Sequence, residues 1–359
     1  MIPASYARGV RVRSRLRSAF HLCASSSLAL AVLLFVPQMA KAQKTWYVNA
    51  GAESGDEARQ ADAFLPNEIW IHENDSVQWT FVPQNEVHTV SFLTASQARP
   101  APPPPIGPGG CPGVTPDSPI PNYDGSACVT SAPASGGANY TITFPKAGNY
   151  KLVCLIHTNM NGTVHVLASA AKLPYDQDDY YRQAGDEAFD LIGDPSNARE
   201  EQRDYPRSAN EVIMTGEVAA TGGGRQYLAV VRFFPGTIHV KVGQTVEWTN
   251  LDPTEPHTIT FGTEPHAPQM RLNVTQDADG ALHGTIGSVN DSVSSGFLQA
   301  AAEDAVGRTE SPVFTAGPFP PAGNSGLTRI RITFTKKGTY NYKCALHDTD
   351  GMLGTIDVE

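Results

Sequence analysis

Two stretches of this 359-residue chain repeat each other, and the repeat restricts the folds that the chain can adopt. Residues 66–92 align without a gap on residues 235–261. Further along, the segment that leads to Cys154 matches the segment that leads to Cys344. A repeat of this length in a chain of this size predicts two domains with the same fold.

Each copy contains a loop that carries a thiol, an imidazole and a thioether, written CLIHTNM in the first copy and CALHDTDGM in the second. The loop residues are Cys154, His157 and Met160 in the first copy and Cys344, His347 and Met352 in the second. Two imidazoles and a thiolate with a weak axial thioether suit copper. Each loop lacks one imidazole, and the repeat register pairs His88 with His257 as the missing upstream ligands.

Other interpretations of these residues are weaker. A single buried cysteine or methionine usually packs in a hydrophobic core, but here both occur with histidine in the pattern Cys-x2-His-x(2 or 4)-Met-x-Gly, and they do so twice. A structural zinc site is disfavoured, because such sites are usually richer in cysteine and lack a thioether. Surface or local packing roles suffice for the other histidines of the mature chain, which are His72, His165, His239, His266 and His283.

The repeated pattern resembles that of cupredoxins, the small blue copper proteins. Residues 340–358 are similar to plastocyanin and pseudoazurin, and residues 154–160 have the shorter spacing of amicyanin. The resemblance implies a Greek-key β-sandwich and a type 1 copper in each copy, with electron transfer as the function. It also implies that the loop histidines lie nearest the surface and pass electrons to a partner.

The sequence departs from the cupredoxin pattern at two places in each copy. Ile156 and Leu346 stand where a proline often precedes the loop histidine. Thr89 and Thr258 stand where an asparagine often follows the upstream histidine. All eight predicted ligands are present despite these changes.

We therefore predict an all-β fold, with two tandem cupredoxin-like Greek-key β-sandwiches joined by an acidic, partly helical linker. The predicted segments are a signal peptide at 1–42, domain 1 at 43–168, the linker at 169–210 and domain 2 at 211–359. The linker is expected to dock through Tyr180, Tyr181, Phe189 and Leu191. Insertions at 93–137 and 262–327 interrupt the domains, and the second contains the pattern of a hairpin around Asp279 and Gly280.

The N-terminus indicates the compartment. Five arginines precede the apolar run LALAVLLFV, and an Ala-Lys-Ala sequence ends at Ala42, as is typical of a secretory signal that is cleaved there. The alternative is a membrane anchor, although the apolar run is near the short limit for a span. We expect a periplasmic or secreted protein with no membrane span in the mature chain.

Charge and cysteine usage agree with that compartment. Removal of residues 1–42 leaves 20 Lys and Arg against 36 Asp and Glu, so the mature chain is acidic. An acidic chain is not expected to bind nucleic acid, and a basic redox protein is the expected partner. Cys23 leaves with the signal peptide. Cys111 and Cys128 are expected to form a disulfide in an oxidising compartment, with two free thiols as the alternative.

The function expected from these features is electron transfer by two type 1 copper centres, without enzymatic activity. The first alternative is copper storage or delivery, which uses the same ligands with exchangeable metal. The second is a copper oxidoreductase of the oxidase or nitrite reductase type. Such enzymes need additional histidine-rich copper sites, typically with His-x-His pairs, and this sequence contains no His-x-His.

Overall fold

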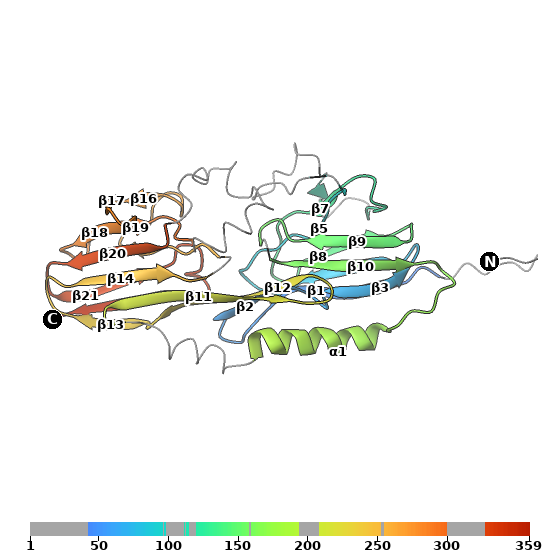
Figure 1. The fold of residues 1–359 in the computed structure, drawn as a ribbon, viewed down its shortest axis with the longest axis horizontal. Coiled ribbons are helices and arrows are strands. Elements are labelled where there is room, and N and C mark those ends of the chain that lie inside the picture. Colours follow the sequence, from blue (N-terminus) through green and yellow to red (C-terminus); the bar gives the residue numbers. More distant parts are fainter. Residues whose placement is uncertain are drawn as a thin grey trace, which may run out of the picture. The chain divides into compact units, whose positions relative to one another are not determined.

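The structure is a computed structural model that describes residues 42–95, 97, 111, 113–114, 120–157, 159–193, 208–252, 255–299 and 327–359. These parts of the chain are mostly β-structure, with one α-helix, α1 (Gln177–Ala188), which a π-helical turn, η1 (Phe189–Gly193), extends (Figure 1). The predicted all-β class is confirmed. The predicted signal peptide, 1–42, lies outside the described residues except for Ala42.

The strands fall into two successive groups along the chain. The first group consists of β1 (Thr45–Glu53), β2 (Arg59–Leu65), β3 (Glu68–His72), β4 (Ser76–Phe81), β5 (Ser91–Phe92), β6 (Gly113–Val114), β7 (Val129–Ser131), β8 (Asn139–Thr143), β9 (Gly148–Val153) and β10 (Asn161–Leu167). The second group consists of β11 (Glu211–Ala220), β12 (Arg225–Phe234), β13 (Thr237–Val240), β14 (Thr245–Asn250), β15 (Thr260–Phe261), β16 (Arg271–Leu272), β17 (Val274–Gln276), β18 (Leu282–Ile286), β19 (Val293–Ser295), β20 (Arg329–Phe334), β21 (Gly338–Lys343) and β22 (Leu353–Val358).

The two groups repeat the same strand pairings. Strand β1 pairs with β2 antiparallel and with β4 parallel, and β11 pairs in the same way with β12 and β14. In the facing sheet, β10 pairs with β3 parallel and with β9 antiparallel, as β22 does with β13 and β21. Each half is a β-sandwich, which confirms the predicted tandem of cupredoxin-like sandwiches.

One sheet runs through both halves, in the order β17-β18-β20-β14-β11-β12-β2-β1-β4-β8. Its halves meet where β12 lies beside β2, the equivalent strand of the first copy (Figure 1). The two strands are antiparallel, with Tyr227 opposite Asp62. Because each of these strands would otherwise be an unpaired edge, the pairing satisfies backbone groups of both. Main-chain hydrogen bonds therefore join the sandwiches, in addition to the linker.

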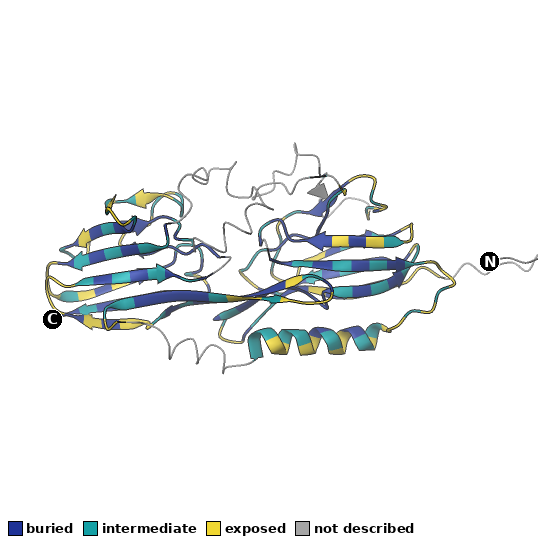
Figure 2. Cartoon of the chain, viewed as in Figure 1, coloured by how far each residue is buried: buried dark blue, intermediate teal, exposed yellow. Residues whose placement is uncertain are grey.

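Each sandwich has its own hydrophobic core. Buried and less buried residues alternate along the strands (Figure 2). Trp79 on β4 and Trp248 on β14, which the repeat aligns, are completely buried. The two tryptophans belong to separate clusters of buried side chains. The period-two alternation seen in the sequence thus produces two similar cores.

The predicted linker contains α1, which a capping box starts at Asp176 and Asp179. Tyr180 is buried in the first core and bonds both backbone groups of Trp70, and Leu191 packs beside a smaller cluster. Tyr181 and Phe189 are 55% and 66% exposed, so their predicted docking role is wrong, because the helical period turns them outward. The domain boundaries themselves stay a prediction.

Helix α1 also contacts the second half. One oxygen of Glu187 accepts hydrogen bonds from the backbone N–H of Asn67 at 3.2 Å and from Nε2 of Gln226 at 2.6 Å. Asn67 follows β2 and Gln226 lies on β12. A single carboxylate therefore connects the helix to both sandwiches.

The insertions are described in part. Cys111 and Cys128 form the predicted disulfide. The predicted hairpin is confirmed as β17 and β18, with Gly280 at a positive φ of 86° in its turn, and it extends the shared sheet beside β20. Residues 300–326 of the second insertion lie outside the described residues. Within the part of the chain that the structure describes, no helix has the length and apolar character needed to cross a membrane.

Candidate metal centres

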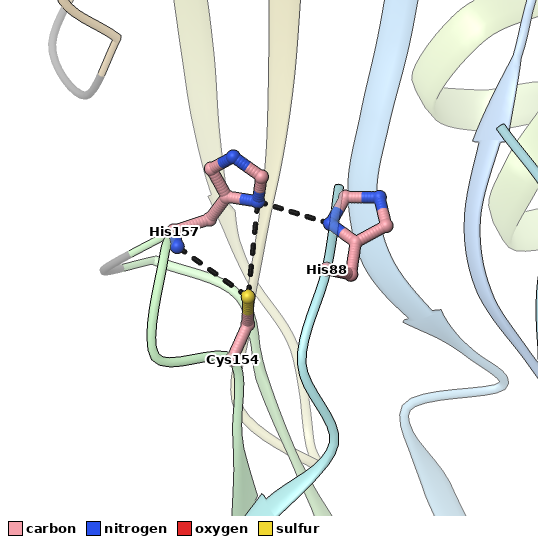
Figure 3. Close-up of side chains that lie close together, drawn as sticks. All are labelled: His88, Cys154 and His157. Atoms are coloured by element: carbon pink, nitrogen blue, oxygen red, sulfur yellow. Dashed lines mark hydrogen bonds between the residues drawn. The ribbon is translucent and has the colours of Figure 1, made fainter. Parts of the chain in front are cut away.

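Three predicted ligands of the first half meet in one buried cluster (Figure 3). Cys154 directly follows β9, and His88 precedes β5 in a stretch whose backbone is hydrogen-bonded to Ala134. Nδ1 of His157 lies 3.8 Å from Sγ of Cys154 and 3.0 Å from Nδ1 of His88. Both rings therefore present the same nitrogen, Nδ1, at the cluster.

The second half repeats this arrangement. Sγ of Cys344, which directly follows β21, lies 3.9 Å from Nδ1 of His257 and 3.5 Å from Nδ1 of His347. These three residues are also buried. The duplicated sequence pattern thus produces two similar groups of side chains.

The loops hold the methionines beside the cysteines although the loops differ in length. The N–H of Cys154 donates to the carbonyl of Met160 at 2.9 Å, and the N–H of Cys344 donates to the carbonyl of Met352 at 3.1 Å. Both methionines are completely buried and share a cluster with their cysteine. All eight predicted residues are therefore gathered as two sets of four, and their role as ligands stays a prediction.

The spacing between sulfur and nitrogen in these groups fits a metal ion. Trigonal ligation, with bonds of about 2.3 Å to sulfur and about 2.0 Å to nitrogen, puts sulfur and nitrogen about 3.7 Å apart. The measured separations of Sγ from Nδ1 run from 3.5 to 3.9 Å. A donor set of one thiolate, two imidazoles and a nearby thioether is that of a type 1 copper site.

The charge state of the cysteines favours metal binding. Burial alone would raise the pKa of the Cys154 and Cys344 thiols. Hydrogen bonds and charges from the neighbouring histidines lower the pKa by more than burial raises it. The pKa of each thiol is therefore held well below its usual range. The thiolate is the form that binds a metal.

The threonines that follow the upstream histidines fasten the cysteines. The N–H of Thr89 donates to Sγ of Cys154 at 3.4 Å, while its hydroxyl accepts from the N–H of Leu155 at 2.7 Å. Thr258 does the same in the second half, with Sγ of Cys344 at 3.3 Å and the N–H of Ala345 at 2.7 Å. These contacts tie the strand of the upstream histidine to the ligand loop.

All four histidines turn their other ring nitrogen, Nε2, toward a carboxylate. The Nε2-to-oxygen distances are 3.9 Å for His88 and Asp62, 3.3 Å for His257 and Asp252, 3.0 Å for His157 and Glu86, 3.5 Å for His157 and Glu255, and 3.9 Å for His347 and Glu86. Metal-bound histidines usually donate this second N–H to a carboxylate, which fixes the ring and its tautomer. The arrangement around His157 and His257 is therefore that of a metal ligand, whereas the carboxylates that face His88 and His347 lie 3.9 Å away, beyond hydrogen-bonding distance.

These four acids were not among the residues predicted from the sequence. Two of these acids could have been found from the sequence, because Glu86 and Glu255 each stand two residues before the upstream histidine and are aligned by the repeat. Asp62 and Asp252 could not have been found in this way, because the repeat register aligns them with Val231 and Pro83, which are not acidic.

The acids differ in their affinity for protons. Burial raises the pKa of Asp62 to about 7 and that of Glu255 to about 8. Burial also acts to raise the pKa of Glu86, but the hydrogen bond and charge of His157 outweigh it and lower this pKa to about 2. Glu86 is thus the acid of the three that is held as an anion.

The expectation that the loop histidines lie near the surface is wrong. His157 and His347 are 2% and 5% exposed, because the ligand loops face the junction of the two sandwiches. His157 of the first half lies beside Glu255 of the second, and His347 of the second half lies beside Glu86 of the first. Each loop histidine therefore contacts an acid of the opposite half.

Comparisons with known proteins give matches among solved structures. No family model matches the chain, and no curated protein matches it. Solved structures do match at a low level. Oxidised plastocyanin from Dryopteris crassirhizoma is 18% identical, over 42% of this chain and 99% of that chain, with a TM-score of 0.20.

Two other cupredoxins match to a similar degree. A mutant of oxidised amicyanin is 18% identical over 44% of this chain and 89% of its own, with a TM-score of 0.22. The purple cupredoxin from Nitrosopumilus maritimus is 20% identical over 42% of this chain and 98% of its own, with a TM-score of 0.20. The chain is thus similar to cupredoxins over part of its length, and the argument for copper rests on its own topology and ligand clusters.

Proposed function

We propose that this chain is a blue copper protein that carries electrons through two type 1 copper centres. The observation that carries the proposal is the pair of buried His-Cys-His groups, in each of which the ligand atoms lie within 4.8 Å of one another. Copper bound there would supply a one-electron couple between its two oxidation states. His88, Cys154, His157 and Met160 would hold one ion, and His257, Cys344, His347 and Met352 would hold the other.

The surrounding residues would keep these ligands in place during a change of charge. The threonine contacts fix each cysteine, and the carboxylates fix the histidine rings. Burial excludes water from both groups. A centre with such fixed ligands transfers an electron with little rearrangement, which suits a carrier.

Four protein ligands leave no open position for a substrate, which supports a carrier over an enzyme. Among the described residues, one further group could hold a metal, Asp62 with His157 and Glu255, and it shares His157 with the first centre. A periplasmic or secreted location is part of the proposal and is supported by the N-terminal pattern. The acidic mature chain supports a basic protein as the redox partner.

A redox cycle tests this function. The copper-loaded mature chain is reduced with ascorbate and reoxidised with ferricyanide, while its visible absorption and copper content are followed. A carrier loses and regains its colour over many cycles and keeps its copper. Release of copper to a mild chelator would support storage or delivery instead, and oxygen consumption above that of the metal-free protein would support an oxidoreductase.

A further inference from the structure

A single carboxylate lies between the two candidate centres. Oε1 of Glu86 is 3.0 Å from Nε2 of His157, and Oε2 of Glu86 is 3.9 Å from Nε2 of His347. The two oxygens of one side chain thus face ring nitrogens of opposite halves. Glu255, the repeat counterpart of Glu86, adds a second carboxylate 3.5 Å from Nε2 of His157.

The same two rings face the cysteines with their other nitrogen. Nδ1 of His157 is 3.8 Å from Sγ of Cys154, and Nδ1 of His347 is 3.5 Å from Sγ of Cys344. A path therefore runs from one cysteine to the other through an imidazole, the Glu86 carboxylate and a second imidazole. The widest gap between non-bonded atoms along it is 3.9 Å.

The junction that contains this path is fixed and largely closed to water. The side chains of Glu86 and Glu255 are 12% and 10% exposed. The N–H of Glu255 donates to Asp252 at 2.7 Å, and the carbonyl of Glu255 accepts from Nδ2 of Asn250 at 3.0 Å. Pairing of β2 with β12 holds the two halves in register beside it.

We infer that the two copper centres exchange electrons with each other through Glu86, so that the protein acts as one coupled two-electron unit. This inference rests on the proposed function. In each exchange, one electron leaves the reduced copper of one half and reduces the oxidised copper of the other. No bond breaks and no proton has to leave, because Glu86 accepts a hydrogen bond from Nε2 of His157 and meets Nε2 of His347 at 3.9 Å as an opposite charge.

The test compares Glu86→Ala with wild-type protein. Copper content is measured first, and the absorption of each centre is assigned with the Cys154→Ser and Cys344→Ser variants. One centre is then reduced by a short light pulse with a photoreductant, and transfer to the other is followed. We expect a first-order step in wild-type protein, independent of protein concentration, which Glu86→Ala slows about tenfold or more with both coppers retained.

Two controls separate the bridge from a merely structural role. Gln84→Ala changes an exposed side chain of the same loop and is expected to leave the rate unchanged. Glu187→Ala removes the carboxylate that connects helix α1 to both halves, and it too should leave the exchange first-order. If Glu86→Ala fails to fold, Glu86→Gln replaces it, and a rate that falls with this substitution supports the bridge.

A second readout does not depend on electron transfer. In the reduced, diamagnetic protein, the Nε2–H proton of His157 is expected to give a slowly exchanging, downfield nuclear magnetic resonance signal that Glu86→Ala shifts or removes. An unchanged rate in Glu86→Ala, or transfer that depends on protein concentration, would overturn the inference. So would three metals in wild-type protein with loss of one in the variant, since the acids would then hold an ion. Fewer than two coppers in wild-type protein would instead contradict the proposed function itself.

Discussion

Glu86 and Glu255 occupy the same position of the internal repeat, and their carboxylates lie beside one nitrogen, Nε2 of His157, at 3.0 and 3.5 Å. One of these acids belongs to the same half as His157 and the other belongs to the opposite half. Pairing of the equivalent strands β2 and β12 brings the two copies of this residue together. The duplication therefore produced both the two ligand sets and the contact between them.

Substitution of one cysteine should remove one centre. Cys344→Ser removes the thiolate of the second group, and the first group should persist because its residues belong to a separate core. We expect copper content to fall from two to one per chain, with loss of one of two charge-transfer bands, and Cys154→Ser should give the complementary result. Loss of both bands in either variant would show that the halves do not fold independently around their metals.

A glycine near the first centre should not tolerate a side chain. Gly51 has a φ of 79°, and a Cβ at this position would clash with Nε2 of His88 and with the ring of Pro83. We expect Gly51→Ala to cost about 1–3 kcal/mol of stability and to weaken copper binding at the first centre only. Copper titration of the variant checks this, with Gly55→Ala as the control because that added Cβ meets no atom within 4 Å. Equal effects of both substitutions would contradict the assigned position of His88.

The hydroxyl of Thr258 should matter for stability before any metal binds. Thr258→Val removes the acceptor of the Ala345 N–H and leaves that backbone group without this bond. This hydrogen bond is partly buried, so its loss is expected to cost about 0.5–1.5 kcal/mol. Urea unfolding of the metal-free protein measures it, and Thr258→Ser, which keeps the hydroxyl, should lie close to the wild type. A valine variant as stable as the wild type would show that water or another group replaces the threonine.

The helix α1 should make stability depend on pH through Glu187. Burial raises the pKa of this carboxyl above its ordinary value of 4.5. The folded state then binds a proton more tightly than the unfolded state, so stability decreases as pH rises from about 4.5 through the folded-state pKa. Glu187→Gln keeps an oxygen that can accept from Asn67 and Gln226, and it lacks this titration.

Urea unfolding at pH 4.0 and pH 7.5 tests this expectation. Relative to Glu187→Gln, the wild type should lose stability between the two values, with a slope of at most about 1.4 kcal/mol per pH unit. Asp186→Asn, which changes an exposed residue of the same helix, is the control. A wild type that gains stability relative to Glu187→Gln as pH rises would have the wrong sign for a buried carboxyl.

Much of the fold and of the site could be predicted because the signals are local. Cys344, His347 and Met352 lie within nine residues, and alternating patterns mark strands such as β4. The upstream histidines came from the repeat, which supplied the long-range pairing that local patterns lack. The repeat also aligns Glu86 with Glu255, so these two acids could have been identified from the sequence as well.

The junction of the two sandwiches could not be predicted in this way. Asp62 approaches His88 and His157 from β2, and β2 takes its place there by pairing with a strand more than 160 residues later. Nothing in the period of either strand specifies that partner. For the same reason, the sequence could not predict that His157 and His347 face the opposite half and are buried.

A copper titration of the metal-free mature chain tests the central claim most directly. The claim is that each half binds one copper through a thiolate. Absorbance from thiolate-to-copper charge transfer is recorded as Cu(II) is added, with total copper measured after gel filtration. We expect a rise that ends at two coppers per chain, and no colour in a variant with both Cys154 and Cys344 changed to serine. A rise that ends at one copper, or bound copper without this absorption, would contradict it.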